Sequence, residues 1–318
     1  MAGNSKGVVV AALIANGAIA ILKFFGYLLT LSPAMLSETY HSISDTGNQV
    51  FLLIGIRYGA RDADRRHPFG YGKAQFFFSF LVSVLLFGIA GWESVKHGYE
   101  ALTHGGHEVA RQPTIPLTDI TLSFPPVYVN YAVLVGAILF ESYAFAKARA
   151  ELKRQIDDHG WSGYREAFRK TSDVTTLTAF TEDFVALAGA GIALSGIYLS
   201  RATGNEVYDA ASALLVGILL MTFAVALAWE NKRLLLGESM PADDEQELRD
   251  LITGWDGVDE LVDFRTVYFG PGNVMVAMEV AFADDLSADV RPDVIDDIET
   301  AIREAQPHAD RIYVEPVD

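Results

Sequence analysis

The stretch Ser37-Glu38-Thr39-Tyr40-His41-Ser42-Ile43-Ser44-Asp45 lies inside a segment, residues 33–59, that is otherwise long and apolar enough to cross a bilayer. His41 and Asp45 are four positions apart, so on a helix they lie about 40° apart on one face, one turn from each other. An imidazole and a carboxylate at this spacing can bind a divalent metal ion together. Each is costly at membrane depth unless it is paired, hydrated or functional. We therefore interpret the pair as part of a metal site within a membrane.

The apolar residues are gathered into long blocks, and a transmembrane helix needs roughly 20 mostly apolar residues. From about Pro241 the remaining 78 residues are strongly polar and predict a separate soluble domain. We expect an α-helical membrane protein, with a transmembrane domain over residues 1–236 and a smaller domain over residues 237–318. The six predicted spans are residues 7–30, 33–59, 74–99, 127–148, 173–200 and 208–229.

The negative charge of the chain is concentrated in the C-terminal part. Residues 241–318 contain 21 Asp or Glu against 5 Arg and no Lys, whereas the first 240 residues contain 20 acidic and 19 basic residues. An acidic surface argues against nucleic acid and against anionic lipid as partners of this domain. It is typical either of a protein from a salt-rich cytoplasm or of an ordinary acidic domain.

The chain contains no cysteine. Disulfides, thiolate zinc sites and cysteine nucleophiles are therefore excluded. A metal ion must be bound by His, Asp, Glu, amide or water ligands.

The basic residues predict which loops face the cytoplasm, because cytoplasmic loops are enriched in Lys and Arg. The loops after the second and fourth spans are rich in both, whereas the loops after the first, third and fifth spans hold at most one. We therefore expect a multi-pass protein of a prokaryotic cell membrane, with both termini, and with them the acidic domain, on the cytoplasmic side.

The C-terminal part has the pattern of a small α+β domain of order α-β-β-α-β, an open ferredoxin-like sandwich with its helices on one face of the sheet. Gly270-Pro271-Gly272-Asn273 is a strong turn signal between two β-rich runs. The predicted elements are a helix over 243–254, strands over 258–269 and 274–282, a helix over 289–305 and a strand over 311–314.

The second span carries a polar stripe at helical spacing. One interpretation is that these side chains bond to neighbouring helices. Two carboxylates and a histidine together instead favour a path for metal or protons. The stripe consists of Glu38, His41, Asp45, Asn48 and Gln49.

The fifth span contains the adjacent carboxylates Glu182 and Asp183. Adjacent residues lie about 100° apart on a helix, so both cannot point equally well at one centre. One would bind a metal while the other bonds within the bundle or relays protons. The alternative is that the helix begins after them and leaves them near water.

These motifs resemble those of the cation diffusion facilitator family of proton-coupled exporters of zinc and related metals. The resemblance covers nearly the whole chain and implies six spans, cytoplasmic termini and a homodimer. It rests on residues 37–45, His67-Pro-Phe-Gly-Tyr-Gly-Lys73, Thr171-Ser-Asp173 through Thr181-Glu-Asp183, and Glu315-Pro316.

The resemblance implies a four-ligand metal site made by two residues of the second span and two of the fifth. His41, Asp45 and Asp183 match this pattern, but the fourth position, usually His, is Ala179. We expect Glu182, or a water molecule that it holds, to complete the site.

Other candidate residues lie outside this set. Asp64 and His67 match part of an accessory metal site in the loop after the second span, where Tyr71 replaces a residue that is often His. The C-terminal strands contain no histidine, so we expect few or no metals there. Glu141 is a candidate pathway residue. Lys23 and Glu93 are interpreted as structural, whereas His104, His107 and His159 are weaker candidates for collecting metal.

The sequence therefore predicts a homodimeric antiporter that exchanges a divalent cation for protons by alternating access. Zn²⁺ is the expected substrate because a mixed His and carboxylate site suits it. Mn²⁺ or Fe²⁺ is the alternative, since the missing histidine makes the ligand set harder. A non-transporting metal sensor or dimer partner of the same fold is a further alternative. A membrane metal hydrolase is disfavoured because the chain has no His-Glu-x-x-His motif. We expect neither an enzyme nor a bound cofactor.

Overall fold

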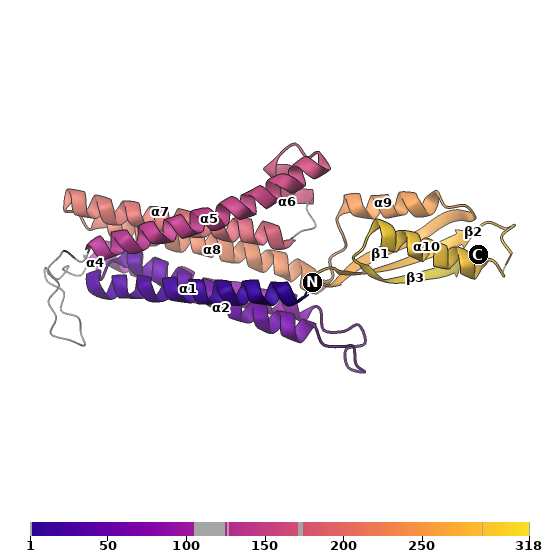
Figure 1. Ribbon diagram of the computed structural model, residues 1–318, viewed down its shortest axis with the longest axis horizontal. Coiled ribbons are helices and arrows are strands. Elements are labelled where there is room, and N and C mark those ends of the chain that lie inside the picture. The colour runs from indigo at the N-terminus through magenta and orange to yellow at the C-terminus, as the bar shows by residue number, and fades with distance from the viewer. Residues whose placement is uncertain (1, 105–124, 126, 171–173, 288, 318) are drawn as a thin grey trace. The chain divides into compact units, whose positions relative to one another are not determined.

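The computed structural model describes residues 2–104, 125, 127–170, 174–287 and 289–317. Most of its helices and strands are labelled in Figure 1. The N-terminal elements are α1 (Ala2–Thr30), α2 (Pro33–Gly59), α3 (Ala74–Leu85), the π-helical turn η1 (Leu86–Gly91), α4 (Trp92–His104), α5 (Val127–His159), α6 (Tyr164–Lys170), α7 (Val174–Thr203) and α8 (Val207–Leu236). The C-terminal elements are α9 (Ala242–Thr253), β1 (Val258–Gly270), β2 (Asn273–Phe282), α10 (Arg291–Ala305) and β3 (Ala309–Val317).

Five of the six predicted spans are helices long and apolar enough to cross a membrane, within the part of the chain that is described. One of these spans is formed by α3, η1 and α4, which follow one another without a break. The five spans are Leu13–Thr30, Ala74–His104, Val127–Asp158, Phe180–Thr203 and Val207–Leu236.

The remaining predicted span is the second along the chain, helix α2. It is too polar to count among the helices that are apolar enough to cross a membrane. Its 27 residues extend over about 40 Å, which is long enough to cross the apolar core of a bilayer. Its polarity comes from the polar stripe, whose members Glu38 and His41 are buried inside the protein. A membrane crossing by α2 therefore stays a prediction, supported by length and by the direction of its polar face.

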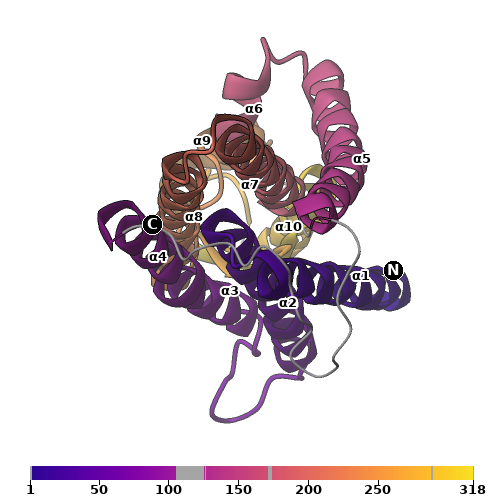
Figure 2. The same ribbon diagram turned by 90° about the vertical axis from the view of Figure 1, so that its left-hand side faces the viewer.

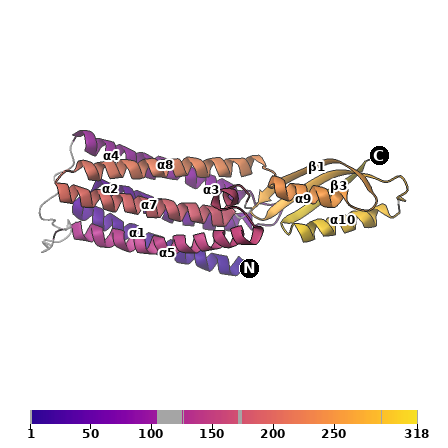
Figure 3. The ribbon, with the colours of Figure 1, turned by 90° about the horizontal axis from the view of Figure 1, so that it is seen from above.

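The chain forms two compact units, Met1–Leu53 with Ser79–Trp229 and Ile54–Phe78 with Glu230–Asp318. In the first unit α5 packs along α7 and against α1, and Figure 2 shows these helices end-on. Helices α7 and α8 lie side by side (Figure 3), where Gly196 of α7 directly faces Ser212 of α8. Gly98 of α4 also allows close approach, since a side chain there would lie 2.6 Å from the Leu214 backbone nitrogen of α8.

The predicted boundary between the transmembrane domain and the C-terminal domain, at residues 236 and 237, stays a prediction.

The predicted α-β-β-α-β order of the C-terminal domain is confirmed. Strands β1 and β2 pair antiparallel across the predicted turn, where Gly272 has φ of +67°, a conformation that favours glycine. Strand β3 follows α10 and pairs parallel to β2, giving the sheet order β1-β2-β3. Every second residue of β2 is buried, as expected for a strand with one covered face.

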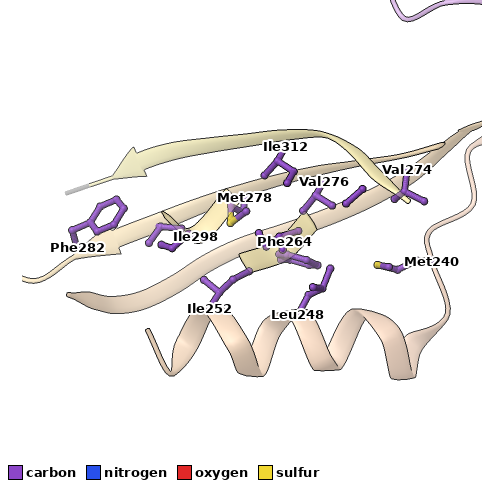
Figure 4. Close-up of a cluster of buried hydrophobic side chains, with 13 residues drawn as sticks. Met240, Leu248, Ile252, Phe264, Val274, Val276, Met278, Phe282, Ile298 and Ile312 are labelled. Atoms are coloured by element: carbon purple, nitrogen blue, oxygen red, sulfur yellow. The ribbon is translucent and has the colours of Figure 1, made fainter. Parts of the chain in front are cut away.

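The core of this domain lies between the sheet and its two helices (Figure 4). Leu248 and Ile252 of α9 and Ile298 and Ile302 of α10 are all fully buried against the sheet. The apolar periodicity of residues 289–305 thus predicted the correct face of α10. From the sheet, the core receives Phe264, Val274, Val276, Met278, Val280, Phe282, Ala309 and Ile312.

The loop between α2 and α3 belongs to the same compact unit as the C-terminal domain. The ring of Phe69 stacks on that of Phe269 with centroids 4.8 Å apart, and Arg311 Nη1 donates a hydrogen bond to the Pro68 carbonyl at 3.4 Å. Gly72 allows this approach, because a side chain there would collide with the Phe269 carbonyl. The second unit therefore combines two segments, Ile54–Phe78 and Glu230–Asp318, that are separated in the chain by residues 79–229.

Candidate metal site in the helical bundle

Helix α2 is anchored at its N-terminus by a residue of α8. Asp209 Oδ1 accepts hydrogen bonds from Ser32 Oγ at 2.9 Å and from the Ala34 backbone nitrogen at 3.0 Å. The carboxylate thus satisfies a backbone N–H that the first turn of the helix leaves unpaired, and its charge is favourable at that end of the helix dipole. Asp209 therefore sets where α2 begins relative to α8.

The first pair of site residues is confirmed as a contact along α2. His41 Nε2 lies 3.2 Å from Asp45 Oδ2, and the two side chains are 4% and 16% exposed. The helical spacing predicted this arrangement. Two different donors, a nitrogen and a carboxylate oxygen, are therefore presented together in a water-poor part of the bundle.

Glu38, predicted to line the pathway, is paired with Lys23 of α1. The Lys23 Nζ and Glu38 Oε2 atoms are 2.8 Å apart, and both side chains are almost completely buried. Lys23 was interpreted as structural, and the ion pair agrees with that interpretation. The pair neutralises a carboxylate that lies one turn from His41 on the same helix.

Asn48 connects the polar stripe of α2 to α7. Its Nδ2 atom donates to both carboxylate oxygens of Glu182, at 3.2 and 3.4 Å. Helix α7 begins at Val174, so Glu182 and Asp183 lie well inside it. The alternative that this helix begins after the two carboxylates is therefore wrong.

The remaining carboxylates of the bundle interact electrostatically with Asp45. The charge of Asp45 acts on Glu182 and Asp183 of α7 and on Glu141 of α5. Glu141, Glu182 and Asp183 are partly buried, as is Gln49 of the stripe. Three helices thus contribute acidic groups to one region of the bundle.

The described residues contain no group of three or more His, Asp or Glu side chains that could hold a metal ion as they stand. His41 pairs with Asp45, whereas Glu182 is bonded to Asn48. The four-ligand set of His41, Asp45, Glu182 and Asp183 therefore stays a prediction. Mutual repulsion is a physical reason for carboxylates to stay apart until a cation joins them.

The accessory residues of the loop after α2 are tied together by hydrogen bonds. Asp64 Oδ1 accepts from the backbone nitrogens of Arg66 and His67 at 2.8 and 2.7 Å, and Asp64 Oδ2 accepts from the Tyr71 hydroxyl at 2.7 Å. His67 Nδ1 lies 3.5 Å from Asp64 Oδ1. Tyr71 thus closes the loop itself, at a position that is often His in the family that the sequence resembles. The sequence did not reveal this role, because a tyrosine gives no metal signal.

We expect Tyr71→Phe to raise the pKa of Asp64. The Tyr71 hydroxyl is the main cause of the lowered pKa of this carboxyl, followed by the backbone N–H of His67. Because the pKa is lowered in the closed loop, the contact stabilises the loop above the ordinary Asp range near 4, and this stabilisation is lost as the pH falls through the lowered pKa. An NMR titration of ¹³C-labelled aspartate measures the change.

The control for this substitution is Tyr313→Phe, which removes a hydroxyl from an exposed side chain of β3. It should leave the Asp64 titration unchanged. An Asp64 pKa that is the same in Tyr71→Phe and in the unsubstituted protein would contradict the assignment.

Of the weaker histidine candidates, only the side chain of His104 lies among the described residues. His104 is exposed and its Nδ1 lies 2.9 Å from Thr103 Oγ1, while Glu93 Oε2 is 3.8 Å from His97 Nε2. His107, the side chain of His159, the side chain of Ala179 and the motif Thr171–Asp173 lie outside the described residues.

Comparison with known families matches both parts of the chain. Residues 9–236 match the cation efflux transmembrane domain, and residues 240–316 match the cytoplasmic domain of cation efflux proteins. Together the two matches cover almost the whole sequence.

Individual relatives agree with the family matches. The chain is 27% identical over 281 residues to metal tolerance protein C4 of Arabidopsis thaliana, covering 88% of this chain and 57% of that protein. It is 30% identical over 275 residues to the human proton-coupled zinc antiporter SLC30A9, mitochondrial, covering 86% and 45%. It is 25% identical over 292 residues to the cation-efflux pump FieF of Escherichia coli O1:K1 / APEC, covering 92% and 86%. The chain thus spans about half the length of the first two relatives.

Proposed function

The chain belongs to the cation efflux family, also called the cation diffusion facilitators, and on this premise we propose that it exports Zn²⁺ across a membrane in exchange for protons. Members of this family are transporters, so the metal is a substrate that is moved and not a cofactor of an enzyme. The observation that carries the proposal is the pairing of buried His41 with partly buried Asp45, in which His41 Nε2 and Asp45 Oδ2 are 3.2 Å apart inside the helical bundle. Ionisable groups within a membrane helix are costly and are usually retained for function.

The acidic groups around Asp45 supply the coupling between metal and protons. Carboxylates that face one another in a medium of low dielectric repel, and either a bound dication or added protons relieve the repulsion. His and carboxylate ligands must also be deprotonated before they bind metal. Metal and protons therefore compete for the same groups, which is the requirement for exchange of one for the other.

The proposed metal site lies between α2 and α7. His41 and Asp45 bind first because they already lie together, and Asp183 joins them from α7. Glu182 completes the set if it exchanges its hydrogen bond from Asn48 for the ion. Three or four ligands of this kind, one of them exchangeable, suit transport, because an ion that is held too tightly cannot leave.

Zn²⁺ is the proposed substrate because a mixed nitrogen and oxygen ligand set suits it. The similarity to a protein named as a proton-coupled zinc antiporter supports this choice. Ala179, at the position where the family usually has His, favours Mn²⁺ or Fe²⁺ as the second candidate, since it leaves a harder ligand set. The same departure supports a non-transporting metal sensor or dimer partner as the alternative function.

We extend the proposal to a homodimer with both termini in the cytoplasm of a prokaryotic cell. The match of residues 240–316 to a cytoplasmic domain supports this orientation, as do the basic loops after α2 and α5. The C-terminal domain joins the two copies, and the bundle alternates between inward-open and outward-open states around the metal site.

The test is metal flux into proteoliposomes under an imposed pH gradient, with Zn²⁺, Mn²⁺ and Fe²⁺ compared in turn. We expect Zn²⁺ flux that requires the gradient and stops when a protonophore collapses it. Protein-free liposomes prepared in parallel give the leak rate. Tight binding without flux for all three metals would replace the exporter with the sensor.

A further inference from the structure

We propose that Glu38, held by Lys23, positions His41 for metal binding from the side of the imidazole that faces away from Asp45. In this arrangement one water molecule accepts a hydrogen bond from His41 Nδ1–H and donates one to Glu38 Oε1, so that Nε2 presents its lone pair to the ion. The inference rests on the proposed function and assigns Glu38 and Lys23 as positioning residues, neither of which touches the metal.

The first observation is a pair of buried polar atoms with no hydrogen-bond partner among the described residues. They are Glu38 Oε1 and His41 Nδ1, and the side chains that carry them are 0% and 4% exposed. The other atom of each side chain is engaged, Glu38 Oε2 with Lys23 and His41 Nε2 with Asp45. Buried polar groups are rarely left unpaired in proteins. One atom is an obligate acceptor and the other is a donor in one tautomer of the ring, so they are complementary.

The second observation is that both atoms face the same point on α7. A Cβ atom added at Gly189 would lie 2.8 Å from Glu38 Oε1 and 3.6 Å from His41 Nδ1. Glycine leaves this point free of side chain, and a water molecule there would have these two polar atoms as hydrogen-bond partners. Glycine at this position of α7 therefore has a local purpose beyond helix packing.

The chemical reason for such a support is general to metal-binding histidines. A ligating imidazole usually donates its other N–H to a carboxylate or carbonyl, which selects the tautomer and the ring orientation. Here the ion pair with Lys23 neutralises Glu38, so that the carboxylate orients the ring without competing for the cation. Lys23, Glu38 and Asp45 act electrostatically on His41, and so do the carboxylates of Glu141 and Glu182.

Gly189→Ala is the first test, with Gly191→Ala as its matched control on the same helix. The added methyl group at residue 189 would displace the bridging contact, whereas a Cβ at residue 191 meets no atom within 4 Å. We expect Zn²⁺ affinity, measured by calorimetry on the purified dimer, to fall about 10- to 100-fold in Gly189→Ala, and to be unchanged in Gly191→Ala. In flux assays the KM should rise while the maximum rate is retained. Equal affinities in the two variants would overturn the proposal.

Glu38→Gln is the second test and does not depend on the folding of Gly189→Ala. With ¹⁵N-labelled histidine, we expect the signal of the Nδ1–H tautomer of His41 to weaken in this variant. We also expect the double variant, which combines Glu38→Gln with Gly189→Ala, to bind Zn²⁺ no more weakly than Gly189→Ala alone. The reason is that both changes remove the same bridging contact. Additive losses, or an unchanged tautomer, would assign these residues to packing alone.

These measurements separate the inference from the function on which it rests. Binding affinity and tautomer are measured without transport, so they test the support for His41 even if no flux is observed. An unsubstituted protein that binds Zn²⁺ but does not transport it would contradict the proposed export function. Zn²⁺ flux together with an affinity that Gly189→Ala leaves unchanged would contradict only the positioning of His41 by Glu38.

Discussion

His41→Ala and Asp45→Ala should each abolish Zn²⁺ flux in proteoliposomes. Loss of a group that merely orients a ligand costs about 10- to 100-fold in metal affinity or activity, so loss of a direct ligand should exceed about 100-fold. The two residues present a nitrogen and an oxygen 3.2 Å apart, and removing either leaves a single protein donor on α2. Flux under a pH gradient measures the loss, and calorimetry separates failed binding from failed movement.

The matched control is Ile43→Ala, which lies between the two residues on α2 but has an exposed side chain. It should transport Zn²⁺ at the rate of the unsubstituted protein. All variants should elute as dimers on size-exclusion chromatography, because neither His41 nor Asp45 belongs to an apolar core cluster. Normal flux by both purified alanine variants would remove the metal site from α2.

Ile298→Ala should strongly destabilise the C-terminal domain. Ile298 is fully buried between α10 and the sheet, and truncating such a residue to alanine costs about 2 to 5 kcal/mol. Opening of the domain should therefore become at least about 30-fold more frequent, since each 1.4 kcal/mol is a factor of ten. Hydrogen exchange of the β2 amides in the full-length protein measures this opening.

Asp297→Ala provides the control, because Asp297 is next to Ile298 on α10 but its own side chain is exposed. It should leave the protection of β2 unchanged within the about 0.5 kcal/mol typical of surface substitutions. Equal β2 protection in Ile298→Ala and Asp297→Ala would mean that the cluster around Ile298 does not hold the domain closed.

The pairing of Tyr71 with Asp64 has a consequence for the loop between α2 and α3. A loop that is closed by its own hydroxyl and carboxylate keeps its shape without a bound metal, and it places Phe69 against Phe269 of β1.

Local periodicity explains how much could be read from the sequence. The order of elements in the C-terminal domain, the turn at Gly270–Asn273 and the buried face of α10 all follow from patterns a few residues long. The contact between His41 and Asp45 is of the same kind, because a helix brings residues four positions apart onto one face whatever surrounds it.

The partners of the site residues were decided by tertiary packing. Lys23 meets Glu38 across 15 positions, Asn48 meets Glu182 across 134, and Gly189 of α7 faces both Glu38 and His41. No periodicity reports such pairs, since they depend on how the helices are rotated and shifted against one another. The sequence by itself thus determined the long helices, the elements of the C-terminal domain, the polar face of α2 and the family, because these depend on short-range spacing and side-chain chemistry. Only the packing of α1, α2 and α7 decided which charges neutralise one another, because burial makes an unpaired charge too costly to remain.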